Sequence, residues 1–283
     1  MVGSMALFAM MAVCARVAER QMSAPQLVLV RFAICGAGVG ALWAARRVEV
    51  RPRNLRLLAL RGVLGGAAVL LYFVAIERCR DTGTATLLNL TSPIFTSLLA
   101  WVFLRERPSA RLGAGVAVAF AGVFLVLRRP GGIAIGWGEA AGIASALLSG
   151  AAVTTIRAAR AYDDAPTILF AFSIAGAAVA LPFAVPAWRV AGPVAWALAV
   201  GVGGTSFFAQ LGMTHAFGLV SASRGALYQQ LTPVFTFALA LALLGERLTA
   251  GSAAGALLTV GAVAWAGAES AGAPQETRQK PSV

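Results

Sequence analysis

The sequence predicts an all-α polytopic membrane protein in which ten transmembrane helices form two inverted repeats of five helices. The first observation is composition, since 59% of the 283 residues are hydrophobic and 12% are charged, with a mean hydropathy of +0.80. This exceeds what the core of a soluble protein needs. The second is that apolar runs long enough to cross a bilayer core, about 20 residues each, divide the chain into ten segments. The third is that the second half of the chain repeats the first.

The repeat is clearest where residues 89–107, NLTSPIFTSLLAWVFLRER, align with residues 229–247, QQLTPVFTFALALALLGER. A shift of 140 gives eight identities in fifteen positions and places Pro93 on Pro233. Apolar composition alone would often match Leu and Ala, but it would not match a proline, a threonine and a Glu-Arg pair at fixed intervals. A repeat of this length implies two homologous halves.

The ten predicted spans divide equally between the halves, residues 1–130 and 131–268. Ala24-Pro25, after the first span, matches Ala165-Pro166, after the sixth, at a shift of 141. A repeated unit with an odd number of crossings enters the membrane from opposite sides, so the halves must be inverted, as in many transporters. Residues 269–283, rich in Gly, Pro, Gln and Ser, are predicted to form a disordered tail. The spans are residues 2–19, 24–45, 57–77, 82–104, 111–128, 138–159, 166–186, 193–214, 218–244 and 250–268.

The positive charges predict the orientation of these spans. The net charge is +12, but the arginines sit singly or in small groups between apolar runs, which is typical of residues that orient helices and not of nucleic-acid binding. With a cytoplasmic N-terminus, thirteen Lys and Arg residues, Arg61 among them, fall on inner segments and eight on outer ones. Both termini are therefore predicted to be cytoplasmic.

Few residues could support metal or cofactor chemistry. Cys14, Cys35 and Cys79 are unpaired in spacing and lie in or beside apolar runs, so we interpret them as small buried residues. The single histidine, His215, removes most metal-centre chemistries, and the chain contains no GxxxxGK[ST] motif. No cofactor and no metal are therefore expected.

Taken together, the chain resembles the drug/metabolite transporter superfamily, in its ten-helix EamA-type branch with two tandem EamA domains. The resemblance is carried by the proline-containing apolar helix, the Glu-Arg that ends it, the Gly-rich helix that follows, and Arg31-Phe32 in the second span. It implies that spans one to four and six to nine surround a central cavity, and that small solutes move by alternating access without ATP. Small four-helix relatives carry a glutamate inside the first helix for proton exchange, whereas Glu19 lies at the end of its span.

Polar residues inside the spans are the candidate substrate contacts, because polar groups in a bilayer usually face protein or water. Arg224 heads a stripe with Ser221, Gly225, Tyr228 and Thr232 at spacings of three and four, which is one helical face. We expect Arg224 to bind a carboxylate or phosphate and Tyr228 to contribute a ring and a hydroxyl. The other candidates are Arg31, Asn89, Ser92, Gln229, Thr232 and Gln210.

Arg31 lies near the start of its span, so its position is compatible both with snorkelling to the interface and with facing the cavity. Pro93 and Pro233 lie mid-span, where a proline removes a backbone hydrogen bond and kinks the helix. Each kink is either a fixed packing feature or a hinge that lines the cavity, and polar neighbours favour the cavity. The residues predicted to form capping or gating ion pairs at helix ends are Glu106, Arg107, Glu246 and Arg247.

The function that these features favour is secondary transport of a small polar or amphipathic metabolite, such as an amino acid, a vitamin or a nucleoside-like compound, across a bacterial inner membrane. The alternative is an integral membrane transferase or protease, but Asp163-Asp164 is the one adjacent acidic pair and no Ser-His set accompanies it. The expected partners are the small-molecule substrate and the lipid bilayer, without nucleic acid. The sequence carries no signal for an oligomeric state.

Overall fold

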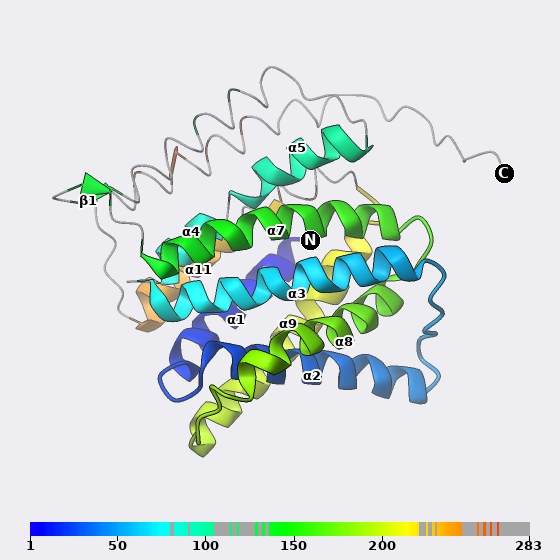
Figure 1. Ribbon diagram of the computed structural model, residues 1–283, viewed down its shortest axis with the longest axis horizontal. Coiled ribbons are helices and arrows are strands. Elements are labelled where there is room, and N and C mark those ends of the chain that lie inside the picture. The colour runs from blue at the N-terminus through cyan, green and yellow to red at the C-terminus, as the bar shows by residue number, and fades with distance from the viewer. Residues whose placement is uncertain are drawn as a thin grey trace.

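The computed structural model describes residues 1–79, 82–89, 91–104, 136–220, 228–229 and 231–244, with isolated positions at 114, 118, 128–129, 132–133, 225, 254, 257–258, 261 and 265. The helices run side by side in a bundle (Figure 1), and a short antiparallel ribbon of β1 (Arg128–Arg129) and β2 (Gly132–Ile133) projects at one end. The helices are α1 (Val2–Ala18), α2 (Ala24–Ala44), α3 (Leu55–Arg78), α4 (Thr82–Asn89), α5 (Ser92–Leu104), α7 (Trp137–Ala159), α8 (Ala165–Ala184), α9 (Pro193–Ala216) and α11 (Leu231–Leu239), which continues as the π-helix η1 (Ala240–Leu244).

Five of the described helices, α2, α3, α7, α8 and α9, are long and apolar enough to cross a membrane. A helix can do so because it satisfies its backbone polar groups within one segment. Predicted spans one to four and six to nine fall on described helices. The fifth span at 111–128, the tenth at 250–268 and the tail at 269–283 lie almost wholly outside the described residues, so the number of ten remains a prediction.

Matching sequence signals begin α2 and α8, the second helix of each half. Ser23 caps α2 and forms a capping box with Gln26, while the Asp164 carboxylate accepts a hydrogen bond of 2.9 Å from the backbone N–H of Thr167 in α8. Each helix carries a proline in its first turn, where the missing N–H costs nothing. The Ala-Pro repeat in the sequence therefore marks two equivalent helix starts.

The predicted fourth span, 82–104, is interrupted just before its proline. Helix α4 ends at Asn89 and α5 begins at Ser92, so Pro93 lies in the first turn of α5. The Thr91 hydroxyl and backbone N–H both donate to the carbonyl oxygen of Leu88, at 2.8 and 3.2 Å. These bonds satisfy a carbonyl that the end of α4 leaves free. The structure thus replaces the predicted kink at Pro93 with a break between two helices.

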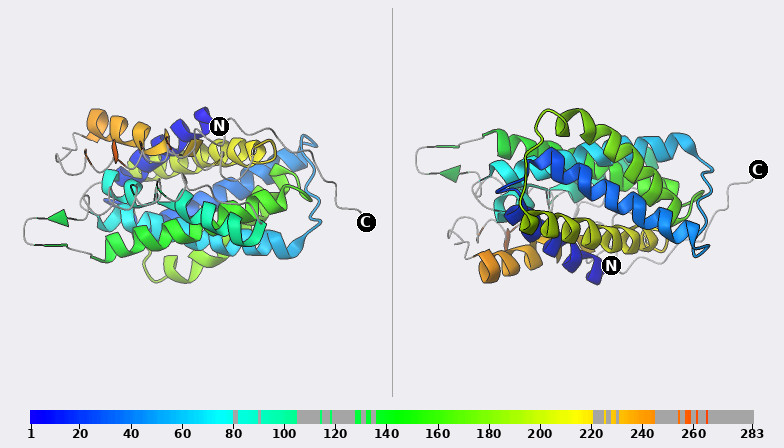
Figure 2. Two further views of the ribbon diagram at one scale, coloured as in Figure 1. Left: turned by 90° about the horizontal axis from the view of Figure 1, so that it is seen from above. Right: turned by 90° about the horizontal axis from the view of Figure 1, so that it is seen from below.

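The main contacts between the described helices are preserved when the two halves of the chain are exchanged. In this exchange α1, α2 and α3 correspond to α7, α8 and α9. The contact of α3 with α7 therefore corresponds to that of α9 with α1, and the contact of α3 with α8 corresponds to that of α9 with α2. The contacts of α4 and α5 with α7 correspond to the contact of α11 with α1. The α2–α8 and α4–α11 contacts each join two equivalent helices, so the exchange leaves them unchanged. Figure 1 shows α7 between α3 and α5, and Figure 2 shows the same bundle from above and below. The repeat in sequence is therefore also a repeat in packing.

The centre of the bundle is built where α2, α3 and α8 meet. Phe32 of α2 and Phe172 of α8 contact edge to face, with ring centroids 4.9 Å apart. Gly176 lets α8 approach both neighbours, because an added Cβ would lie 2.5 Å from Cε1 of Phe32. The three cysteines are free thiols, buried at positions 35 and 79 and half-buried at Cys14.

Candidate functional site

A cavity of about 150 Å³ lies between the two halves and is lined by residues of α1 to α5, α7 to α9 and α11. Much of its lining consists of residues that are equivalent in the repeat. At the shift of 141 that aligns the first three helices of each half, or 140 for the fourth, seven lining pairs match. These pairs are Phe8 and Ser149, Met11 and Ala152, Arg31 and Phe172, Val69 and Gln210, Tyr72 and Met213, Asn89 and Gln229, and Ser92 and Thr232.

Arg31 lines this cavity and does not extend toward the end of α2. Its side chain is 1% exposed, and its Nε donates a hydrogen bond of 2.8 Å to the Ser206 hydroxyl of α9. The guanidinium carbon lies 4.9 Å from the ring centroid of Phe32 and 6.0 Å from that of Phe172. Of the two positions compatible with the sequence, the structure therefore shows the one inside the bundle.

Arg61 is a second buried arginine in the cavity. Its prediction as one of the charges of the cytoplasmic segment was wrong, because it lies inside α3. It is 3% exposed, and its guanidinium carbon lies 3.8 Å from the ring centroid of Phe172. Gly65, one turn further along α3, provides the space, because a Cβ at this position would overlap Nη1 of Arg61. No clear signal in the sequence indicates this placement, because helical side chains usually lean toward the N-terminus, whereas Arg61 folds over Gly65 on its C-terminal side.

The two arginines lack a counter-ion among the described residues. No described residue that lines the cavity is acidic, and neither Nη1 of Arg31 nor Nε of Arg61 has a hydrogen-bond partner there. Placing an arginine at the centre of a bilayer costs at least about 2.5 kcal/mol on insertion scales, and a desolvated cation–π contact offsets about 2 kcal/mol or more. The contacts with Phe32 and Phe172 therefore offset part of the cost, and the cavity contents must supply the rest.

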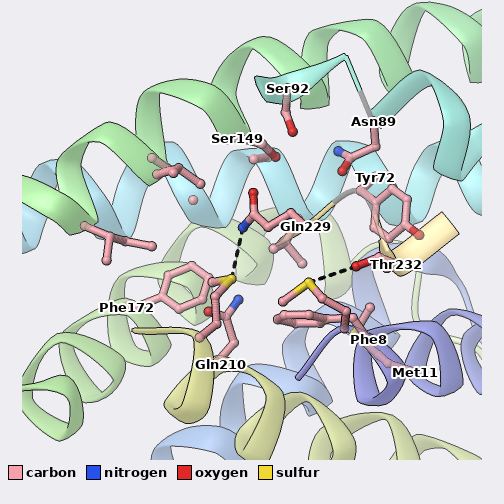
Figure 3. A pocket seen from close by; sticks show the side chains of 18 of the residues that line it. Phe8, Met11, Tyr72, Asn89, Ser92, Ser149, Phe172, Gln210, Gln229 and Thr232 are labelled. Atoms are coloured by element: carbon pink, nitrogen blue, oxygen red, sulfur yellow. Dashed lines mark hydrogen bonds between the residues drawn. The ribbon is translucent and has the colours of Figure 1, made fainter. Parts of the chain in front are cut away.

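Uncharged polar side chains also line the cavity (Figure 3). Asn89, Ser92, Gln229 and Thr232 point into one shared space. The Asn89 amide donates to the Ser145 hydroxyl at 2.8 Å, which in turn donates to the carbonyl oxygen of Ala68.

Three of these polar groups are poorly satisfied within the protein. The Gln229 amide and the Thr232 hydroxyl each contact a methionine sulfur at 3.1 Å, that of Met213 and Met5 respectively. Thioether sulfur is a weak acceptor. The buried Oε1 of Gln210 has no partner among the described residues. These groups are therefore free to exchange their present contacts for hydrogen bonds with a bound solute.

Six of the eight predicted substrate contacts line this cavity. Arg224 lies outside the described residues, and Tyr228 is 46% exposed and is not among the described lining residues. The predicted gating residues Glu106, Arg107, Glu246 and Arg247 also lie outside the described part of the chain, and for Pro233 only the backbone in α11 is described. The predicted residues that the cavity brings together are Arg31, Asn89, Ser92, Gln210, Gln229 and Thr232.

The model of the EamA-like transporter family matches residues 1–128 and 136–267. The chain belongs to the EamA-like transporter family. The cavity thus lies between the two stretches that match this family, and each stretch carries one member of every equivalent lining pair.

Individual transport proteins are also similar to this chain in sequence. The pseudopaline exporter CntI of Pseudomonas aeruginosa (strain UCBPP-PA14) is 26% identical over 233 residues, which covers 81% of this chain and 80% of that protein. Solute carrier family 35 member G1 of Mus musculus is 38% identical over 82 residues, but the match spans only 29% of this chain and 22% of the mouse protein. A solved structure described as "Crystal structure of protein" superimposes with a TM-score of 0.71, covering 94% of each chain at 21% identity, and so shares the fold.

Proposed function

We propose that this protein is a secondary transporter that moves a small polar or amphipathic metabolite across the inner membrane by alternating access. The observation that carries the proposal is the cavity lined by seven equivalent pairs from the two halves. In transporters built from inverted repeats, the substrate site lies at the interface of the repeats. A relative that covers most of this chain is named as an exporter of a small molecule, pseudopaline.

The architecture that goes with this function is a set of ten helices in two inverted repeats, with the fifth and tenth spans at the periphery. The exchangeable helix contacts support it, because two halves that pack on each other reciprocally are related by a pseudo-two-fold axis. Both termini would be cytoplasmic. Removing Arg61 from the inner charges leaves twelve inner against eight outer residues, so the charge bias keeps its direction.

Alternating access in such a protein requires the halves to rock around the cavity. Rocking would open the contact between α1 and α11 as it closes the equivalent contact of α7 with α4 and α5, or the reverse. The turn at Thr91, between α4 and α5, and the π-helix η1 lie in the equivalent fourth helices of the two halves, at positions where the backbone departs from α-helical hydrogen bonding. π-Helical turns and helix breaks are frequent at functional sites. We therefore assign these two segments to gating.

The alternative of a membrane enzyme loses its best candidate residues. The Asp163 carboxylate accepts hydrogen bonds from the backbone N–H groups of Arg53 at 2.7 Å and Asn54 at 3.3 Å, and Asp164 caps α8. Both acids therefore hold the ends of helices and do not face the cavity lining. This engagement favours transport over catalysis.

Reconstitution into liposomes tests the proposal. Uptake of labelled amino acids, vitamins, nucleosides and pseudopaline would be measured against empty liposomes and against Ser149→Phe, which fills the cavity with the residue type of its counterpart, Phe8. The matched control is Leu147→Phe, on the exposed face of the same helix. We expect at least one solute to show protein-dependent uptake that Ser149→Phe abolishes and Leu147→Phe preserves. Uptake of none of these solutes by correctly folded protein would refute the proposal.

A further inference from the structure

The cavity is symmetric in its helices but asymmetric in its charge. Both of its arginines come from the first half, whereas the equivalent positions in the second half are Phe172 and Val202. Gln210, Gln229 and Thr232, which are uncharged, come from the second half. A solute in this cavity therefore meets cations from the first half together with neutral hydrogen-bonding groups from both halves.

The way in which the arginines are held leaves their donors available. A structural arginine in a protein interior is usually paired with a carboxylate or hydrogen-bonded to several oxygens. Arg31 instead has one hydrogen bond, to Ser206, and Arg61 has none among the described residues. Both guanidinium groups are held in place by aromatic rings, and a ring orients a cation without occupying its N–H groups.

The shared aromatic ring brings the two cations to the same part of the cavity. Phe172 lies 3.8 Å from the guanidinium carbon of Arg61 and 6.0 Å from that of Arg31. Two like charges around one ring repel each other, and burial strengthens the repulsion because the local dielectric constant is low. An anion between them would remove this repulsion and would satisfy the free donors at the same time.

We propose that the transported solute is an organic anion whose carboxylate or phosphate group binds between Arg31 and Arg61, with the rest of the solute along the uncharged polar lining of the cavity. The proposal rests on the transport function proposed above and names its substrate class. Guanidinium groups match the planar or tetrahedral oxygens of carboxylate and phosphate through paired hydrogen bonds. A neutral solute would leave both charges uncompensated.

The test uses the purified full-length protein in detergent, with thermal unfolding as the readout. The probes are three pairs that differ in net charge: succinate and succinamide, L-glutamate and L-glutamine, and glycerol 3-phosphate and glycerol. Because glutamine keeps its α-carboxylate, the glutamate pair tests the second carboxylate alone. Sodium chloride keeps the ionic strength equal, because salt alone changes electrostatic interactions. We expect at least one anion to raise Tm above its neutral partner, since a ligand that binds the folded state stabilises it. Succinate or glutamate responding alone would assign the group as a carboxylate, and glycerol 3-phosphate alone as a phosphate.

Variants then connect the response to the two arginines. Arg61→Gln and Arg31→Gln are expected to weaken binding of the stabilising anion about tenfold to a hundredfold, which is the usual effect of losing a charge-assisted hydrogen bond. Arg56→Gln is the control, because Arg56 lies on the same helix as Arg61 but is exposed. If Arg61→Gln does not fold, Gly65→Ala keeps both charges, displaces the Arg61 guanidinium and is expected to weaken binding as well.

Stability without ligand gives a second, independent readout. If the Arg61 charge has no counter-ion until an anion binds, Arg61→Gln removes an uncompensated charge and is expected to raise Tm in the absence of probes. A lower Tm, an equal response to both members of every pair, or full anion binding by Arg61→Gln would each overturn the proposal. Transport of a neutral metabolite by the wild type in liposomes would then still support the transport function, so the two proposals fail separately.

Discussion

Gly176→Ala tests whether the centre of the bundle is as tightly packed as the structure shows. The added methyl group would lie 2.5 Å from Cε1 and 2.6 Å from Cε2 of Phe32, well inside normal contact distance. Relieving this overlap requires movement of the ring that stacks on Phe172 and lies beside Arg31. Overpacking of this kind usually costs about 1–3 kcal/mol, while replacing a helical glycine with alanine gains up to about 1 kcal/mol.

The matched control is Gly201→Ala in α9, where the added methyl group has no neighbour within 4 Å. Both variants gain the same helix propensity, so their difference isolates the overpacking term of about 1–3 kcal/mol. At about 2–4 °C per kcal/mol for chains of 150–250 residues, Gly176→Ala should unfold several degrees below Gly201→Ala. Detergent unfolding at one fixed heating rate measures the difference, since unfolding of such proteins is often irreversible. Equal Tm values for the two variants would show that α2 and α8 do not cross as closely as described.

Three further substitutions test particular contacts. Ser206→Ala leaves Nε of Arg31 without its acceptor and should lower stability by about 1–3 kcal/mol; an unchanged Tm would mean that this bond contributes nothing. Asp164→Ala removes the cap of α8 and should cost about 0.5–2 kcal/mol with transport retained at lower temperature, whereas loss of transport by stable protein would revive an enzymatic or binding role. Pro93→Ala removes the ring that disfavours a continuous helix from α4 into α5 and should slow liposome uptake more than it weakens ligand binding; equal changes in both would identify the break as a packing feature.

The placement of Gln229 and Tyr228 shows what the sequence could and could not predict about the site. Helical spacing placed Tyr228 on one face with Thr232, but the structure turns a neighbouring face inward, with Gly225, Gln229, Thr232 and Thr236 buried or lining the cavity. Thr232 follows Tyr228 by four residues and Gln229 by three, so helical spacing is equally compatible with either face turning inward. Periodicity alone cannot choose between them.

The repeat contained the information needed for the choice. At the shift of 140 the inward face of the second half corresponds to Ala85, Asn89, Ser92 and Thr96, and all four positions are buried or line the cavity. The face that is small or polar in both copies is therefore the inward one. Tyr228, in contrast, corresponds to the apolar Leu88, which is fully buried but is not among the described residues that line the cavity.

Arg61 was missed for a different reason, because charge counting treats every arginine near a span boundary as part of a loop. Helix α3 begins at Leu55, two residues before the predicted start at 57, so Arg61 lies further inside the helix than the predicted boundary indicated. Its burial then depends on Gly65 and on the ring of Phe172, which is distant in sequence. Only the three-dimensional packing brings these residues together.

Several equivalent positions carry different residues in the two halves, and these differences depend on one another. Arg31 and Phe172 are equivalent, and so are Gly65 and Ser206. Arg31 donates to Ser206, and Arg61 lies against both Gly65 and Phe172. An arginine at position 172 would restore symmetry, but it would add a third buried cation and would remove the ring that holds Arg61, while a serine at position 65 would take the space of the Arg61 guanidinium. The differences between the halves are thus mutually dependent, and together they place both described cations of the cavity in the first half of the chain.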